Sequence, residues 1–184
     1  PPPPLRPPHS PHSTLRSTMS PTRLSPGPAR FLRRAAAAAS GADTAANPLV
    51  ANVRTANDRL HDVSVAVAEG FAPIPCASGI EGGSMGIHYV NAEYLKDNIV
   101  DIARPEAVMY EPKPDGSLEL IAVEYITAKG PAALQGHLFS FTNSPNRYGL
   151  GPFYELHVWA WKSNPTGSFA DNNPDVSCDP AKSE

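Results

Sequence analysis

Prolines crowd the first 28 positions of the chain and limit where a folded domain can lie. Proline has a fixed φ angle and no backbone donor, so this segment cannot continue a helix or a sheet ladder. Residues 1–42 also contain six arginines and no aspartate or glutamate, and an alanine run follows at 35–39. This composition is typical of a targeting segment for export or for organellar import. We therefore expect residues 1–47 to be a disordered leader or targeting segment, 48–178 a single domain and 179–184 a tail.

The chain beyond this leader is acidic. Nine of the 15 basic residues and all 18 acidic residues lie after position 42, which gives this part a formal charge of −9. Nucleic acid and anionic membranes are bound by clustered lysine and arginine, so neither is an expected partner. The sequence has no apolar run long enough for a membrane span. The expected partner is a small molecule.

Hydrophobic periodicity predicts one helix followed by several strands. Asn47 before Pro48 is a favourable helix start, and apolar residues then recur at steps of three and four as far as Val67. One amphipathic helix is expected over about 49–69. Runs typical of strands lie at 87–91, 107–111, 118–127 and 153–161, with a further short one at 137–141 and a hairpin signal at Asp115-Gly116. The expected fold is α+β, with the helix packed on a mostly antiparallel sheet of four to five strands.

Two polar residues lie within apolar strands. Alternation places Glu124 on one strand face with Leu120, Ala122 and Ile126. A carboxylate there must be paired, hydrogen-bonded or metal-bound, because an unpartnered buried charge costs several kcal/mol. His157 shares its strand face with aromatic residues, and either that face or the opposite one can be the face that the helix covers.

Two further histidines complete a possible metal site. His88 lies in a strand that follows three glycines, and His61 lies at the edge of the helical stripe. Imidazoles and one carboxylate suit Zn, Cu, Fe or Mn, and an open coordination position would permit enzymatic chemistry. The predicted ligands are His61, His88, Glu124 and His157, with Glu124 as ligand or general base and Tyr89, Phe153 and Trp159 holding a small substrate.

Other functions remain open at this stage. The sequence contains no HExxH, GxSxG, P-loop or dinucleotide motif. The same residues could instead form a small-ligand site without catalysis, or a buried polar network in a structural extracellular domain. Cys76 and Cys178 match no CxxC spacing, and composition alone permits either one long-range disulfide or two unrelated thiols.

Several motifs of the chain together resemble a family of small bacterial proteins that are generally predicted to be exported and have no assigned activity. The similarity covers roughly residues 50–178 and includes Gly86-Ile87-His88-Tyr89-Val90-Asn91, Val123-Glu124-Tyr125, Leu156-His157-Val158-Trp159 and Asn173-Pro174 with Ser177-Cys178. The resemblance implies a secreted or periplasmic protein, a Cys76–Cys178 disulfide and a shared polar site at the four predicted ligands. The leader and the glycine-rich segment 78–84 depart from the family pattern.

Overall fold

A computed structural model describes residues 47–78 and 82–183 of the 184-residue chain. The predicted leader, residues 1–47, lies outside the described residues except for its last position. Within the described ranges, no helix is long and apolar enough to cross a membrane.

The first helical segment is divided, so the prediction of one continuous helix over 49–69 is wrong. It consists of α2 (Pro48–Asn57), the 3-10 turn η1 (Asp58–His61) and α3 (Val63–Ala68). Asp62 has an extended backbone and caps α3, because its side chain accepts a hydrogen bond from the backbone N–H of Ser64. The break shifts the apolar stripe, so that Ala66 is buried while Val67 is 55% exposed.

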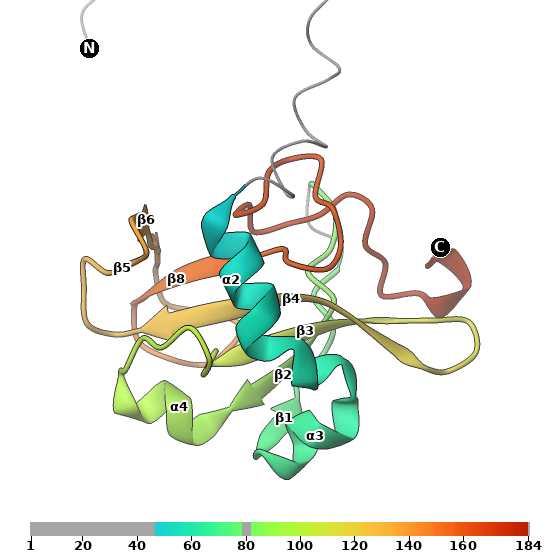
Figure 1. Cartoon of the computed structure of the whole chain (residues 1–184), viewed down its shortest axis with the longest axis horizontal. Coiled ribbons are helices and arrows are strands. Elements are labelled where there is room, and N and C mark those ends of the chain that lie inside the picture. Colours follow the sequence, from blue (N-terminus) through green and yellow to red (C-terminus); the bar gives the residue numbers. More distant parts are fainter. Residues whose placement is uncertain (1–46, 79–81, 184) are drawn as a thin grey trace, which may run out of the picture. The chain divides into compact units, whose positions relative to one another are not determined.

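Six antiparallel strands form the main sheet in the order β1-β2-β3-β4-β8-β7. Figure 1 labels β1 to β4 and β8 of this sheet. Their bounds are β1 (Phe71–Pro73), β2 (Ile87–Asn91), β3 (Ala107–Pro112), β4 (Leu118–Thr127), β7 (Ser140–Thr142) and β8 (Phe153–Val158). The remaining elements are α4 (Ala92–Asp97), the two-stranded ribbon of β5 (Ala133–Leu134) and β6 (His137–Leu138), and the 3-10 turn η2 (Pro180–Lys182). The α+β class and the antiparallel sheet are as predicted, but the sheet is larger. Its edge strands, β1 and β7, have three residues each and therefore carry little periodic signal.

The turn between β3 and β4 follows the Asp-Gly signal. Gly116 has a φ of +84°, which glycine adopts at little cost, and the N–H of Lys113 donates to the carbonyl of Ser117. This hairpin joins β3 to β4, the longest strand of the sheet.

The two faces of the sheet bury different residues. Helices α2 and α3 contribute to the core on one face (Figure 1). The sheet residues of that core include Val108, Tyr110, Val123, Tyr125, Leu156 and Val158. Because side chains alternate along a strand, His88, Glu124 and His157 belong to the opposite face. There the buried cluster contains Met109, Ile121, Ala122, Trp159 and Val176.

Candidate metal site

Strand register brings three of the four predicted ligands together. Glu124 on β4 lies directly opposite His157 on β8. On the other side of β4, Glu124 lies opposite Ala107 of β3, while His88 of β2 lies opposite Met109 of β3. The small side chain of Ala107 therefore leaves room for His88 and Glu124 to approach each other across β3.

The distances within this triad suit coordination of one ion. His88 Nε2 lies 3.3 Å from Glu124 Oε2, and His157 Nε2 lies 3.6 Å from the same oxygen. One potential ligand atom from each residue lies within 4.8 Å of the other two. Two ligand atoms bound tetrahedrally at about 2.0–2.1 Å from zinc are about 3.3 Å apart, which is close to both separations.

The triad is buried, and several of its polar atoms lack hydrogen-bond partners. The side chains of His88, Glu124 and His157 are at most 2% exposed. Both Nε2 atoms, His157 Nδ1 and Glu124 Oε1 make no hydrogen bond within the part of the chain that the structure describes. The contacts at 3.3 and 3.6 Å are therefore electrostatic contacts without hydrogen-bond geometry. Buried polar atoms without partners are uncommon in proteins and call for an explanation such as a bound ion or water.

Groups around the triad can orient its imidazole rings. Asp171 Oδ1 lies 3.4 Å from His157 Nδ1, and the carbonyl oxygen of Gly86 lies 3.3 Å from His88 Nδ1. Metal-binding histidines generally donate from the second ring nitrogen to a carboxylate or a carbonyl. Both histidines therefore have an acceptor of the required kind on the side away from Glu124.

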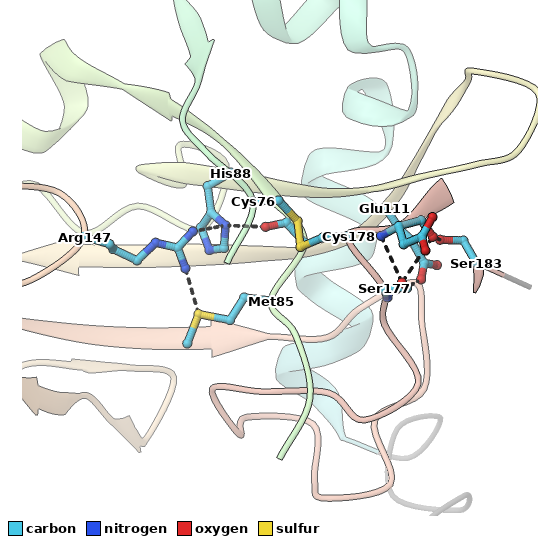
Figure 2. Close-up of a disulfide and its surroundings, with 10 residues drawn as sticks. Cys76, Met85, His88, Glu111, Arg147, Ser177, Cys178 and Ser183 are labelled. Atoms are coloured by element: carbon cyan, nitrogen blue, oxygen red, sulfur yellow. Dashed lines mark hydrogen bonds between the residues drawn. A yellow bond between two sulfur atoms is a disulfide. The ribbon is translucent and has the colours of Figure 1, made fainter. Parts of the chain in front are cut away.

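The segment 143–152, between β7 and β8, supplies two residues that the sequence did not indicate. The hydroxyl of Tyr148 donates to Glu124 Oε2. Arg147 reaches His88 Nδ1 at 2.6 Å and Met85 Sδ at 2.7 Å, as Figure 2 shows. Because a guanidinium only donates, His88 Nδ1 is the acceptor and the ring proton lies on Nε2. Arg147 and Tyr148 lie in an irregular segment, where no periodicity predicts the direction of a side chain.

The surroundings give the two histidines opposite tendencies to bind a proton. Burial lowers the pKa of His88 to about 4, against the attraction of Glu124. Burial also disfavours the charge of His157, but Glu124 and Asp171 outweigh it and raise its pKa to about 9. The pKa of Glu124 is lowered, because its electrostatic contacts with His157 and His88 overcome the effect of burial. The triad without metal therefore holds one charged and one neutral imidazole beside a carboxylate.

A cavity of about 220 Å³ adjoins the triad. Its lining consists of Met85, Glu124, Thr142, Pro145, Asn146, Arg147, Tyr148, Phe153, Glu155 and His157. Burial and the neighbouring Glu124 raise the pKa of Glu155 to about 8, and its carboxyl group accepts a hydrogen bond from Thr142. Pockets for drug-sized ligands measure about 300–1,000 Å³, so this cavity suits a smaller molecule. Glu155 lies two residues from His157 on β8, so alternation could have placed it on the site face.

Three predicted site residues lie elsewhere. The side chain of His61 is 51% exposed in η1, 3.5 Å from Asp58, and its ring lies against Trp161. Its prediction as a ligand fails because η1 packs on the helix-covered face. Tyr89 follows His88 in the strand and therefore lies on the opposite face, where its ring contacts Tyr110.

Trp159 shares the face of His157 but does not line the cavity. It is fully buried against Met109 and Val176, and its indole N–H donates to the carbonyl of Ala170 at 2.6 Å. The sequence indicated its face correctly, but the C-terminal segment covers it. Phe153 does line the cavity, with its ring against Tyr148.

The predicted disulfide is present between Cys76 and Cys178. It links the C-terminal segment to Cys76 (Figure 2). The next residue, Ala77, forms a β-bridge with Gly86, two residues before His88. The site is thus assembled from strands β2, β4 and β8, from the segment 143–152 and from the C-terminal segment that carries Asp171. Comparisons of the chain with protein-family models, with curated proteins and with solved structures find no match.

Proposed function

We propose that the protein binds one divalent transition metal through His88, Glu124 and His157 and is an enzyme that acts on a small substrate in the adjoining cavity. The observation that supports this most is the set of three buried ligand atoms within 4.8 Å of one another. Two imidazoles and one carboxylate form a ligand set that suits Zn, Cu, Fe or Mn.

A three-residue ligand set leaves coordination positions for water or substrate, as in catalytic metal sites. When bound, a metal would supply a Lewis acid that activates a water or a substrate oxygen. Glu155 lines the same cavity, and its carboxyl group accepts a hydrogen bond from Thr142. We therefore assign Glu124 to the ligand set and Glu155 to proton exchange with a substrate in the cavity.

Coordination by His88 has a consequence for Arg147. When Nε2 is a ligand, the ring proton lies on Nδ1, where the carbonyl of Gly86 is an acceptor at 3.3 Å. Nδ1 can then no longer accept the hydrogen bond from Arg147 that the structure contains. The guanidinium becomes available to another acceptor in the cavity that it lines.

A second candidate function is a site for a small ligand without metal. The hydrogen bond from Tyr148 to Glu124 Oε2 favours it, because that oxygen is also the one nearest to both imidazoles. In this case the triad is a polar network that shapes the cavity. Both functions predict a small-molecule partner, and they differ in whether a metal is bound.

The disulfide supports a location outside the reducing cytosol. Disulfides persist in the periplasm and outside the cell and are rare in cytosolic proteins. We therefore propose that the protein is secreted or periplasmic, in line with the family that the sequence resembles.

The test is the metal content of the full chain. The protein is expressed with an export route, purified without a histidine tag, incubated with Zn, Cu, Fe or Mn, desalted and analysed by mass spectrometry. We expect close to one metal ion per chain, which the double variant H88A/H157A loses.

The matched control is the double variant H61A/H137A. It also removes two imidazoles, but both lie outside the triad. It should retain the metal. Absence of metal from the wild type with all four ions would refute the metal centre and leave the metal-free ligand site.

A further inference from the structure

We propose that the cavity selects small organic carboxylates and that Arg147 binds the carboxylate group. This inference rests on the proposed function, because the cavity adjoins the triad His88, Glu124 and His157. It adds a substrate class and a specificity-determining residue to that function.

Arg147 has only weak acceptors for its charge. Within the described residues its guanidinium donates hydrogen bonds to an imidazole nitrogen of His88 and to the thioether sulfur of Met85, and it lies 5.4 Å from the ring centroid of Tyr148. Neither acceptor carries a negative charge. A carboxylate forms charge-assisted hydrogen bonds that are roughly twice as strong as neutral ones and can pair with the planar guanidinium at two points.

The acidic residues of the cavity are occupied by other groups. Glu124 accepts from Tyr148 and faces His157, and Glu155 accepts from Thr142. Within the described residues, Arg147 forms no ion pair with a carboxylate, whereas Arg59 pairs with Glu69 and Arg104 with Asp97. Arg147 is therefore an exposed cation that lines the cavity and has no carboxylate partner within the described residues.

The remaining walls define the body of the ligand. Met85, Pro145, Tyr148 and Phe153 provide apolar surface around a volume of about 220 Å³. This volume is below the usual range for drug-sized molecules. A short apolar chain or one small ring that carries a carboxylate fits these constraints, with its acidic end at Arg147 and its body near the triad.

An isosteric series tests the inference with ligands of stated charge. Butyrate, butyramide and butylamine have similar size and differ in the charge of one end. Their dissociation constants are measured by ligand-observed NMR on the full chain, with and without added metal, and metal content is determined on the same samples. We expect butyrate to bind about tenfold more tightly than the other two, the difference between charge-assisted and neutral hydrogen bonds.

The variant Arg147→Gln should lower the affinity for butyrate to that for butyramide and leave the metal content unchanged. Arg104→Gln, which removes an arginine from an ion pair outside the cavity, should leave both unchanged. Equal affinities for butyrate and butyramide, preference for butylamine, or an Arg147→Gln variant that still prefers butyrate would each overturn the proposal. Absence of metal would refute the proposed metal centre separately, because butyrate affinity is also measured without metal.

Discussion

Glu106 shows how burial of a single residue makes the stability of this fold depend on pH. Its side chain is fully buried, Oε2 accepts from the N–H of Ile126 at 2.8 Å, and Oε1 has no hydrogen-bond partner in the described residues. Burial raises its pKa from 4.5 to about 8. Between these two values the folded protein retains the proton and the unfolded chain releases it. The free energy of unfolding therefore falls as pH rises through this window.

The variant Glu106→Gln should remove this pH dependence. Glutamine keeps an acceptor for Ile126 but does not titrate. From pH 5 to pH 8 the wild type should lose several kcal/mol relative to the variant, since each pKa unit corresponds to about 1.4 kcal/mol. Urea unfolding at a series of pH values measures both slopes. Parallel slopes for the two proteins would contradict the assignment.

At the scale of elements, the segment 143–152 owes its shape largely to one side chain. Asn146 Oδ1 accepts from the N–H groups of Tyr148 and Leu150, both at 3.2 Å, and its Nδ2 donates to the carbonyl of Leu150 at 2.9 Å. These hydrogen bonds lie within the segment and fix its conformation. The segment places Arg147 and Tyr148 at the site. The ligands of the proposed metal lie on strands β2, β4 and β8 instead, whose positions are set by the ladder of the sheet.

The variant Asn146→Ala should therefore loosen the segment and spare the metal. We expect amide hydrogen exchange within 143–152 to accelerate by about tenfold, corresponding to the loss of about 1–1.5 kcal/mol of hydrogen bonding. Butyrate affinity should fall while metal content stays the same. Asn143→Ala is the matched control, because within residues 47–78 and 82–183 the Asn143 side chain accepts only from the N–H of Ser144. Unchanged exchange in Asn146→Ala would show that other contacts hold the segment.

At the scale of the whole molecule, the disulfide closes most of the described domain into one loop. Cys76 and Cys178 are 102 residues apart in sequence. Next to the bridge, the N–H of Ser177 donates to the buried carboxylate of Glu111 on β3 at 2.9 Å (Figure 2). The C-terminal segment that covers Trp159 and carries Asp171 is thus attached by the disulfide to Cys76, three residues after β1, and by a hydrogen bond to Glu111 on β3.

Removal of the bridge should destabilise the protein strongly. For a loop of this length, the chain-entropy estimate gives about 4–5 kcal/mol of stabilisation. The double variant C76S/C178S should lose about that much free energy of unfolding in urea. Reductant should lower the stability of the wild type toward that of the variant and have no effect on the variant. A wild type that is equally stable in reductant would contradict this estimate.

Much of the candidate site could be predicted from strand alternation, and the rest could not. Alternation within 118–127 and 153–161 places Glu124 and His157 in buried strand faces, where a polar side chain requires a partner. For His61 the single-helix prediction was wrong, because Asp62 provides a second N-cap within the apolar stripe. Tyr89 was predicted from its aromatic character, and Trp159 also from the strand face that it shares with His157. Neither feature distinguishes a cavity wall from a core.

The sequence by itself determined the fold class, the main strands, the hairpin at Asp115-Gly116 and the polar character of His88, Glu124 and His157, because these depend on local periodicity and turn chemistry. Only the tertiary structure decided that these three residues meet, that His61 does not join them, and that Arg147 and Tyr148 cover them. Contacts between distant parts of the chain decide which strands become neighbours. They also decide where the irregular segment 143–152 packs against the sheet. Local patterns carry no information about those contacts.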